Sequence, residues 1–348
     1  LMKVAIITDQ HFGARKNSKL FHDFFLKFYN DVFFPTLEER GIKVVVDMGD
    51  TFDSRKGIDF SALAWAKNNY YDRLAQMGVT VHTIVGNHTA YYKNTNDLNA
   101  VDLLLREYQN VIIYSEPTEV KLGNLPVLFV PWINEENSQN TFQCVKDFPG
   151  VHAMGHLELN GYPAHRGHLM AQGLDGKLFK NFKQVFSGHY HTRSSDGQVF
   201  YLGNPYEIYS NDMGDDRGFH IYDTDTQELE VVNNPYTMYD VIYYEDTPHQ
   251  TFNYSKFSNK IVKLIVRKKT DIKKYEKFVD KLIKSDISEL NIIELDVGEV
   301  VDLDKYDPES EDTISILNRY VKDSDQEIDK SEIQNLIYEI YQEACEIV

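Results

Sequence analysis

The sequence predicts an α/β fold in which β-sheets pack together and are flanked by helices. Up to about residue 110, short β-branched runs alternate with stretches of helical periodicity. From about residue 111 to 222, strand-like runs predominate. The chain has 348 residues, which suits two domains better than one. We therefore expect a helix-flanked β-sandwich, followed by a small α+β domain and a helical tail.

Three strands and three helices are expected in the first 110 residues. The strand-like runs are Val4–Ile7, Val44–Val46 and Val79–Val85, and helical spacing covers Leu20–Leu37, Ser61–Met77 and Asp97–Tyr108. Pro35 is expected to kink or end the first helix, because proline lacks the amide donor that a helix interior needs. Gly78 is placed to close the second helix.

The second part of the chain is read as mostly strands. These are Val111–Tyr114, Val127–Val130, Val151–Met154, Val185–Ser187, Val199–Leu202 and Phe219–Tyr222. Helix-containing units followed by a β-rich half are typical of packed sheets covered by helices.

Breaks in composition divide the chain into four predicted parts. After Asn233-Asn234-Pro235, the strands Lys260–Val266 and Leu290–Val297 flank a basic amphipathic helix at Ile272–Ile283. An acidic stretch then precedes a tail that carries an apolar stripe from Ile333 to Ala344. The parts are a large α/β domain at 1–235, a small capping domain at 236–300, an acidic linker at 301–312 and a helical tail at 313–348.

Charge is spread unevenly along the chain. The net charge of −18 argues against a protein that coats nucleic acid without specificity. Residues 301–348 hold 14 Asp and Glu against 4 Lys and Arg, whereas residues 255–284 hold 11 Lys and Arg against 3 Asp and Glu. The basic stretch is either a solvated helix face or a contact surface for the DNA backbone, and its one-sided charge favours DNA.

Cysteine usage and hydropathy favour a cytoplasmic protein. Cys144 and Cys345 are far apart and show no Cys-x-x-Cys spacing, so a disulfide framework is not expected. No apolar run is long enough to span a bilayer, and we expect no membrane association. The first residues are read as a strand and not as a signal peptide.

Polar side chains of metal-ligating type follow five of the predicted strands. They are Asp9 and His11, then Asp50 and Asp53, then Asn87 and His88, then His156, and last His189 and His191. Because ligands of α/β sheets bind beyond the carboxyl ends of strands, all five sets can converge at one rim. Glycine precedes the polar residue in four of the motifs, where we expect it to let the backbone turn sharply.

The ligand chemistry indicates divalent cations. Carboxylates, amides and imidazoles without cysteine favour Mn²⁺, Fe²⁺ or Zn²⁺ with an open coordination position. An isolated His-x-His pair is more often structural, with about one chance in five of binding metal. With five such motifs in one chain, metal binding is far better supported than a coincidence of structural histidines. Two adjacent ions would form a clamp for in-line displacement at phosphorus.

These motifs resemble those of a known family. In order, Asp-x-His, Gly-Asp-x-x-Asp, Gly-Asn-His, Gly-His-x-Glu and Gly-His-x-His resemble the calcineurin-like metallophosphoesterases. Within that family, Gly-Asp-x-Phe-Asp and Val-Gly-Asn-His are similar to the SbcD-type nucleases of DNA double-strand-break repair. The stretches WINEEN, GHLELNGY and SGHYHT are similar to the nuclease subunits of T-even-like phage recombination endonucleases.

The resemblance implies a role for each site residue. Two divalent ions are expected, with Mn²⁺ favoured and Mg²⁺ as the alternative. The first ion would take Asp9, His11, His191 and a shared Asp50, and the second would take Asp50, Asn87, His156 and His189. His88 would be catalytic, beside the scissile phosphate. Glu158 would at most support His156.

One position departs from the family pattern. The residue after Gly-Asn-His is commonly acidic in relatives, but here it is Thr89, which offers only a neutral hydrogen bond. In many relatives an aspartate at the position of Asp53 orients the catalytic histidine and raises its pKa, whereas some nucleases carry histidine there. The sequence therefore supports an Asp53–His88 catalytic dyad as a hypothesis.

The resemblance also implies function and partners. It predicts a metal-dependent DNA exonuclease and endonuclease that processes DNA ends in recombination and double-strand-break repair. The protein would form a homodimer and bind an SMC-like, SbcC-type ATPase through its C-terminal helices, since it has no Gly-x-x-x-x-Gly-Lys phosphate loop of its own. Two alternatives stay open: a phosphatase of the same fold, and a non-catalytic scaffold.

Overall fold

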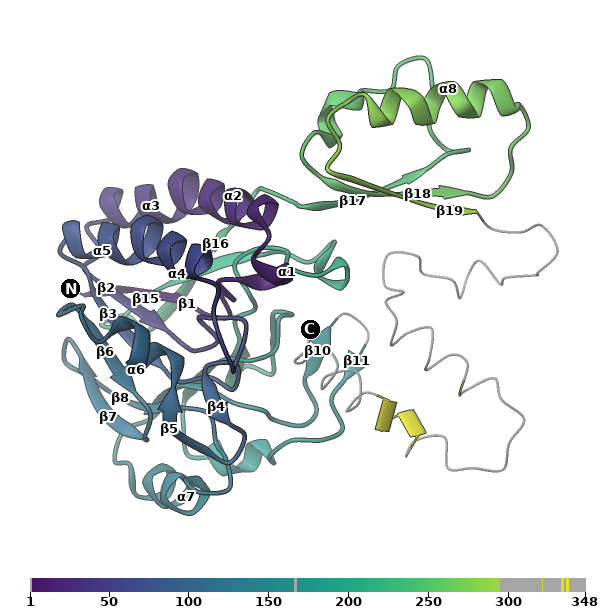
Figure 1. The fold of residues 1–348 in the computed structure, drawn as a ribbon. Coiled ribbons are helices and arrows are strands. Elements are labelled where there is room, and N and C mark those ends of the chain that lie inside the picture. The colour runs from purple at the N-terminus through teal and green to yellow at the C-terminus, as the bar shows by residue number, and fades with distance from the viewer. Residues whose placement is uncertain (1, 166–167, 295–320, 322–332, 335, 338–348) are drawn as a thin grey trace. The chain divides into compact units, whose positions relative to one another are not determined.

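Two six-stranded β-sheets form the centre of the first of two compact units (Figure 1). The computed structural model describes residues 2–165, 168–294, 321, 333, 334, 336 and 337. The first unit contains residues up to Tyr206 together with Asp215–Pro235, and the second contains Glu207–Gly214 and the chain from Tyr236 onward. The predicted linker at 301–312 and nearly all of the predicted tail at 313–348 lie outside the described residues.

The first sheet is mainly parallel and has the order β16-β15-β1-β2-β3-β6. Its parallel strands are β1 (Lys3–Ile7), β2 (Val44–Asp47), β3 (Thr80–Ile84) and β6 (Val111–Tyr114). The strands β15 (Gly218–Asp223) and β16 (Glu228–Asn233) extend it in antiparallel pairing beside β1. The carboxyl ends of β1, β2 and β3 therefore lie at one edge of the sheet.

The second sheet repeats this arrangement with the order β13-β14-β12-β9-β8-β7. Its parallel strands are β8 (Leu125–Val130), β9 (His152–His156), β12 (Gln184–Gly188) and β14 (Val199–Tyr201). The antiparallel edge strands are β7 (Thr118–Leu122) and β13 (Ser194–Ser195). Here β9 and β12 are neighbours with adjacent carboxyl ends.

The core of the unit lies between the two sheets. Val4 and Ile6 of the first sheet join one buried cluster with Phe129 and Met154 of the second. The alternate residues of β1, among them Ala5, are equally buried because helices cover the other face. Buried on both faces, the central strands read as continuous apolar runs, which is why they were predictable from the sequence.

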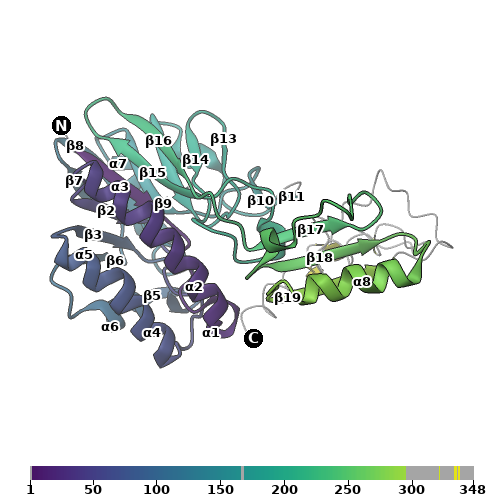
Figure 2. The same cartoon turned by 90° about the horizontal axis from the view of Figure 1, so that it is seen from above.

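Two interrupted helices cover the outer face of the first sheet (Figures 1 and 2). The first comprises α2 (Lys19–Phe28), a π-helical turn at Tyr29–Phe33 and α3 (Phe34–Glu39); the second comprises α4 (Phe60–Ala66), a π-helical turn at Lys67–Tyr71 and α5 (Asp72–Gln76). The helix does not end at Pro35, as one of the two predicted outcomes had it, but passes through a π-helical turn just before it. The Phe34 amide bonds the Tyr29 carbonyl across the wide turn, and the ring of Pro35 then lies at the start of α3, where no amide donor is needed.

The third predicted helix is shorter than expected. The segment α6 spans Ala100–Leu105, and Asp97 instead lies in β5 (Thr95–Asn99), which pairs with β4 (Ala90–Tyr92). The Asn99 side chain accepts a hydrogen bond from the Asp102 amide and so begins the helix. Further elements of this unit are the short turn α1 (Ala14–Asn17), α7 (Ser138–Asp147), β10 (Pro163–His165), β11 (His168–Leu169) and a 3₁₀ turn at Gly176–Phe179.

The second unit is a three-stranded parallel sheet with one long helix. The strands β17 (Tyr239–Tyr243), β18 (Ile261–Val266) and β19 (Glu289–Glu294) pair in that order, and α8 (Ile272–Ile283) connects the last two. Short 3₁₀ turns occur at Ser210–Asp212 and Tyr254–Phe257. The apolar face of α8 packs on the sheet, which leaves its lysine-rich face exposed.

Within the residues that the structure describes, no helix combines the length and the apolarity needed to cross a bilayer.

Candidate metal centre

Eight of the nine predicted site residues follow strands, and His156 is the last residue of β9; the carboxyl ends of these strands meet at one rim of the first unit. The loops after β1, β2 and β3 come from the first sheet, and those after β9 and β12 come from the second. The side chains form overlapping groups whose ligand atoms lie within 4.8 Å of one another. The first group is Asp9, His11 and His191, the second is Asp50, His156 and His189, and a third, which shares His11 with the first, adds Asp53 and His88 to it.

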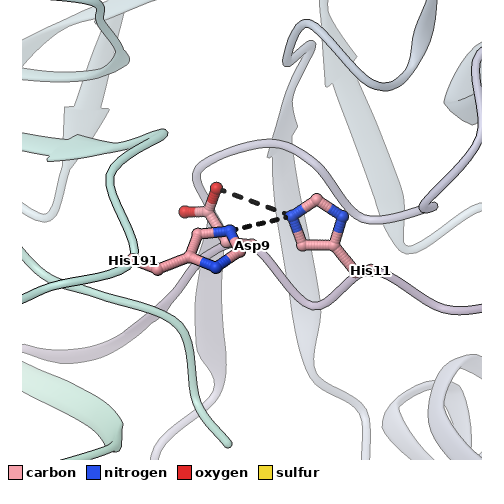
Figure 3. A group of neighbouring side chains, drawn as sticks. All are labelled: Asp9, His11 and His191. Atoms are coloured by element: carbon pink, nitrogen blue, oxygen red, sulfur yellow. Dashed lines mark hydrogen bonds and ion pairs between the residues drawn. The ribbon is translucent and has the colours of Figure 1, made fainter. Parts of the chain in front are cut away.

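The first group joins residues of the first motif, Asp9 and His11, with His191 of the last motif (Figure 3). Nε2 of His11 lies 3.2 Å from Nε2 of His191 and 4.0 Å from Oδ1 of Asp9. Ligand atoms about 2.0–2.2 Å from one ion lie within about 4 Å of each other, so these separations fit a shared cation. The three side chains are therefore placed to hold one metal ion.

Asp53 orients His11 within this group. Nδ1 of His11 lies 3.0 Å from Oδ1 of Asp53, and an ionised carboxylate can only accept, so Nδ1 carries the proton and Nε2 presents a lone pair to the site. Although burial opposes ionisation, the hydrogen bond from His11 and the nearby imidazoles hold the pKa of Asp53 below its usual value.

The hypothesis of an Asp53–His88 dyad needs correction. Nδ1 of His88 donates its hydrogen bond to the main-chain carbonyl of Asp53 at 2.7 Å. The carboxylate of Asp53 instead accepts a hydrogen bond from Nδ1 of His11. Residue 53 therefore orients both imidazoles, but only the carbonyl acts on His88. Since a carbonyl only accepts, Nε2 of His88 is the nitrogen left for a substrate.

The second group centres on His156. Its Nδ1 donates to the Met48 carbonyl at 2.9 Å, while Nε2 lies 2.9 Å from Oδ1 of Asn87 and 3.1 Å from Oδ2 of Asp50. Nδ1 of His189 lies 3.0 Å from the same oxygen of Asn87. A neutral Nε2 would face two oxygen lone pairs, so this arrangement requires a cation among these atoms, either a proton or a metal ion.

Electrostatics separates the two imidazoles of the second group. Burial would lower the pKa of His156, but the carboxylate of Asp50 outweighs it and raises that pKa to about 9. Burial, reinforced by the charge of His156, lowers the pKa of His189 well below its usual value. The site thus attracts positive charge at His156 and keeps His189 neutral, which is the form that ligates metals.

Four of the predicted ligands have unusual backbone conformations. Asp9, His11, Asp50 and His189 have φ angles of 54°, 47°, 49° and 83°. This left-handed region costs a non-glycine residue on the order of 1–3 kcal/mol and is typical of functional loops. The surrounding fold therefore imposes these conformations and aims the side chains at the rim.

The glycines of the motifs act mainly through space and not, as expected, through sharp turns. Only Gly49 among the four has a left-handed φ, at 108°. A Cβ on Gly86 would overlap Oδ1 and the amide of Asp50, and one on Gly188 would overlap Oγ1 of Thr8. These glycines allow neighbouring ligand loops to approach each other closely.

Thr89 closes the turn that carries Asn87 and His88. Its hydroxyl accepts from the Gly86 amide and donates to the Gly86 carbonyl, both at 3.0 Å. These are neutral hydrogen bonds, as its side chain predicts, and they hold the turn without adding charge.

Several supporting residues were not predicted. Buried Asp47 accepts from Gln10, from Thr51 and from the Gly49 amide, and burial raises its pKa to about 7. A charged residue that ends the apolar strand Val44–Asp47 was the available signal. Glu158 does not hold His156, because both nitrogens of that ring have other partners.

Arg217 and Asn204 support His191 from behind. Arg217 donates to the main-chain carbonyl of His191 and to Oδ1 of Asn204, while Nδ2 of Asn204 lies 3.4 Å from Nδ1 of His191. Both residues are buried and lie beyond the last motif, so no local pattern pointed to them.

A model of the calcineurin-like phosphoesterase family matches residues 2–193, more than half of the chain, and that range contains all nine predicted site residues. The chain belongs to the calcineurin-like phosphoesterase family. The predicted family and the predicted α/β sandwich are thereby confirmed.

Relatives of this calcineurin-like phosphoesterase include a phage protein. Exonuclease subunit 1 of Enterobacteria phage T4 is 33% identical over 295 residues, which are 83% of this chain and 85% of that protein. An archaeal phosphodiesterase structure covers 67% of this chain and 100% of its own, at 13% identity and a TM-score of 0.35. The match to the structure of Pseudomonas putida nuclease MPE covers 66% of this chain and 87% of that nuclease, at 15% identity and a TM-score of 0.32. At such TM-scores the structural likenesses carry no argument, and the assignment depends on the sequence matches.

Membership of this phosphoesterase family fixes the general chemistry. Its members bind divalent metals, and the two groups described above offer the ligand atoms for them. The prediction of an enzyme is confirmed at the level of a phosphoesterase.

Proposed function

We propose that the protein is the nuclease subunit of a DNA-end-processing complex and hydrolyses phosphodiester bonds with two divalent metal ions. The observation that carries this proposal is the pair of ligand groups, one around His11 and His191 and one around His156 and His189, at a single rim. Its 33% identity to a phage exonuclease subunit supports DNA as the substrate.

The proposed ligands are assigned to two ions. Asp9, His11 and His191 hold the first, and Asn87, His156 and His189 hold the second, with Asp50 shared between them. The fit of the second set rests on His156, whose Nε2 already faces the oxygens of Asn87 and Asp50. The absence of thiolates from the set favours Mn²⁺, with Mg²⁺ as the alternative.

His88 acts directly on the substrate in this proposal. When bound, the ions would supply an activated water and stabilise charge on the phosphate. The Asp53 carbonyl fixes the proton of His88 on Nδ1, and the His88 amide donates to Oδ1 of Asp50 at 2.8 Å. With its ring and its backbone both held, Nε2 of a protonated His88 can give a proton to the leaving 3′ oxygen.

The second unit provides a candidate DNA contact. Lys273, Lys274 and Lys277 lie on the exposed face of α8, and among the described residues they form no ion pair. Phosphates are the groups that such an unneutralised row of lysines binds best. We propose that this face contacts the DNA backbone in recombination and double-strand-break repair.

Partner binding is proposed on the relative and on the sequence pattern. The phage relative is named a subunit, which supports a second protein in the complex. We propose that this is an SMC-like ATPase bound through the helical pattern at 313–348, and that the nuclease forms a homodimer. Both interfaces are tested by co-purification and by measurement of mass in solution.

The decisive experiment compares DNA cleavage in Mn²⁺ and in EDTA for wild type and His88→Ala. We expect cleavage only with Mn²⁺, and a loss of at least about 100-fold in the variant with its metal content unchanged. His82→Gln, on the strand β3 that leads to His88 but bonded to the Tyr114 hydroxyl, serves as the matched control. Full activity of His88→Ala would remove His88 from the mechanism.

The same assay separates the alternatives. A linear duplex and a small phosphomonoester are offered to the metal-loaded protein in parallel. Faster hydrolysis of the monoester would indicate a phosphatase, and bound metal without cleavage of either substrate would indicate a scaffold.

A further inference from the structure

A cavity of about 360 Å³ lies beside the metal centre, and the mechanism above does not use it. The loop after β8, the helix α7 and the segments after β9 and β11 form its walls, with Trp132, Phe142, Glu158 and Leu174 among the lining residues. Its volume is at the lower end of the range of small-molecule sites, which is roughly 300–1,000 Å³.

Trp132 links this cavity to the proposed metal ligands. Its indole lines the cavity, and the ring centroid lies 5.2 Å from that of His189. The backbone is fixed on both sides, since the Trp132 amide donates to the Val85 carbonyl at 2.8 Å and its carbonyl accepts from Asn96 and Asn137. Trp132 thus lies between the cavity and the proposed ligand His189, and its backbone is anchored.

Glu158 supplies an acceptor without a partner. Its main-chain carbonyl accepts from the Leu174 amide at 2.8 Å, which fixes the backbone at the cavity wall. Among the residues that the structure describes, no hydrogen bond or ion pair engages its carboxyl group, and the residue is only partly buried. A carboxyl group at a cavity wall that has no partner in the protein can accept hydrogen bonds from a ligand.

The lining determines which chemistry can enter. An indole offers a flat face for stacking, and a carboxyl group accepts hydrogen bonds from amino and ring N–H groups. A second carboxylate, Glu135, also lines the cavity, so a phosphate would meet like charge there. A planar ring with N–H groups on its edge fits, and a phosphate does not.

We propose that this cavity binds a nucleobase of the DNA strand, next to the phosphodiester held at the metal centre. The base stacks on Trp132 and donates hydrogen bonds to Glu158. Guanine fits best, because two adjacent N–H groups on its edge match one carboxylate. This inference rests on the proposed function for its choice of DNA as the ligand.

Binding is measured without metal, so that the phosphate site does not contribute. Trp132 and Trp65 are the two tryptophans of the chain. In a Trp65→Phe background, Trp132 fluorescence is titrated in EDTA with dGMP and, separately, with deoxyribose 5-phosphate. We expect saturable quenching by dGMP and none by the sugar phosphate. Equal quenching by both ligands, or no quenching by dGMP, overturns the proposal.

Glu158→Gln tests the acceptor while keeping the shape of the side chain. We expect it to weaken dGMP binding about tenfold. Glu119→Gln removes the same charge from an exposed position on β7 and is expected to bind dGMP like the parent. If both variants bind alike, Glu158 is not the acceptor and the proposal fails.

An oligonucleotide series distinguishes this proposal from the proposed function. An abasic site next to the cleaved bond should raise KM about tenfold for wild type, and by much less for Glu158→Gln. If the abasic site leaves the KM for cleavage unchanged, the base pocket is refuted and the proposed nuclease function still stands. Quenching by dGMP in a protein that cuts no DNA refutes the nuclease and leaves the pocket.

Discussion

Three imidazoles of the metal centre are oriented by a hydrogen bond at the nitrogen that faces away from it. The partners are the Asp53 carboxylate for His11, the Asp53 carbonyl for His88 and the Met48 carbonyl for His156. Each partner fixes the tautomer before any ion or substrate arrives. Asp53 and Met48 are not proposed to bind the ions, but they determine which nitrogen of each imidazole faces the site.

Gly86→Ala tests the close approach of two ligand loops. The added Cβ would overlap Asp50, and we expect the free energy of unfolding to fall by about 1–3 kcal/mol. Urea denaturation measures this change. Gly57→Ala is the matched control, because a Cβ there meets nothing within 4 Å and the φ angle is not left-handed. Equal stabilities of the two variants would contradict the packing argument.

His220 gives a pH dependence that does not involve the metal centre. Burial in β15, followed by the charge of Arg193, lowers its pKa from 6.5 to about 3. The folded state therefore keeps His220 neutral, while the unfolded state takes up a proton below pH 6.5. The stability that this residue contributes is complete above pH 6.5 and falls by about 1.4 kcal/mol per pH unit below it.

His220→Gln isolates this effect. Between pH 7 and pH 5, wild type should lose about 2 kcal/mol of unfolding free energy more than the variant, as measured by urea denaturation at each pH. Parallel losses in the two proteins would show that His220 is protonated in the folded state.

At the scale of elements, the buried strands and the amphipathic helices were predictable. β6 at Val111–Tyr114 and α8 at Ile272–Ile283 coincide with the predicted ranges, because each has an uninterrupted apolar pattern. The ends of these strands bring the metal-type side chains together at one rim, and their role as ligands stays a prediction. Where the apolar pattern is strong, sequence and structure agree.

Elements without such patterns were missed. Half-exposed β7 and polar α7 have few buried residues, so neither has a clear period. The wide turn at Tyr29–Phe33 depends on tertiary packing and allowed a helix to continue past Pro35. The hydrogen-bond partners of Asp53 and Asn204 could not be predicted from the sequence either, since they depend on contacts between distant loops.

If the exposed face of α8 contacts DNA, DNA binding should depend on salt concentration through its lysines. Replacing Lys273, Lys274 and Lys277 with Gln should weaken DNA binding. It should also reduce the slope of log K against log salt by roughly 0.9 for each lysine that contacts a phosphate. Binding titrations from 50 to 200 mM salt measure the slope.

A matched triple variant controls for net charge. Lys121, Lys146 and Lys177 are exposed in the first unit, and their replacement by Gln removes the same charge. An identical loss of affinity in both triples would assign the effect to overall charge and not to α8.

At the scale of the whole molecule, metal binding should stabilise the fold. The ligand groups come from loops of both sheets, so a bound ion holds the two sheets together. At Mn²⁺ concentrations 100 times the Kd, we expect about 2.7 kcal/mol of added stability relative to EDTA. Thermal unfolding with and without Mn²⁺ measures it. A gain that persists in Asp9→Asn combined with His156→Gln would place the ion elsewhere.

The contact between His11 and His191 joins positions 180 residues apart, and this bears on how the protein is made. The first sheet is completed later still, because β15 and β16 add beside β1 only after residue 233. Until residue 191 has been synthesised, a nascent chain on the ribosome lacks His189 and His191. Until β15 has been synthesised, the edge of β1 is unpaired. Products that end before His189 therefore lack ligands of both metal groups and could not bind the proposed pair of ions.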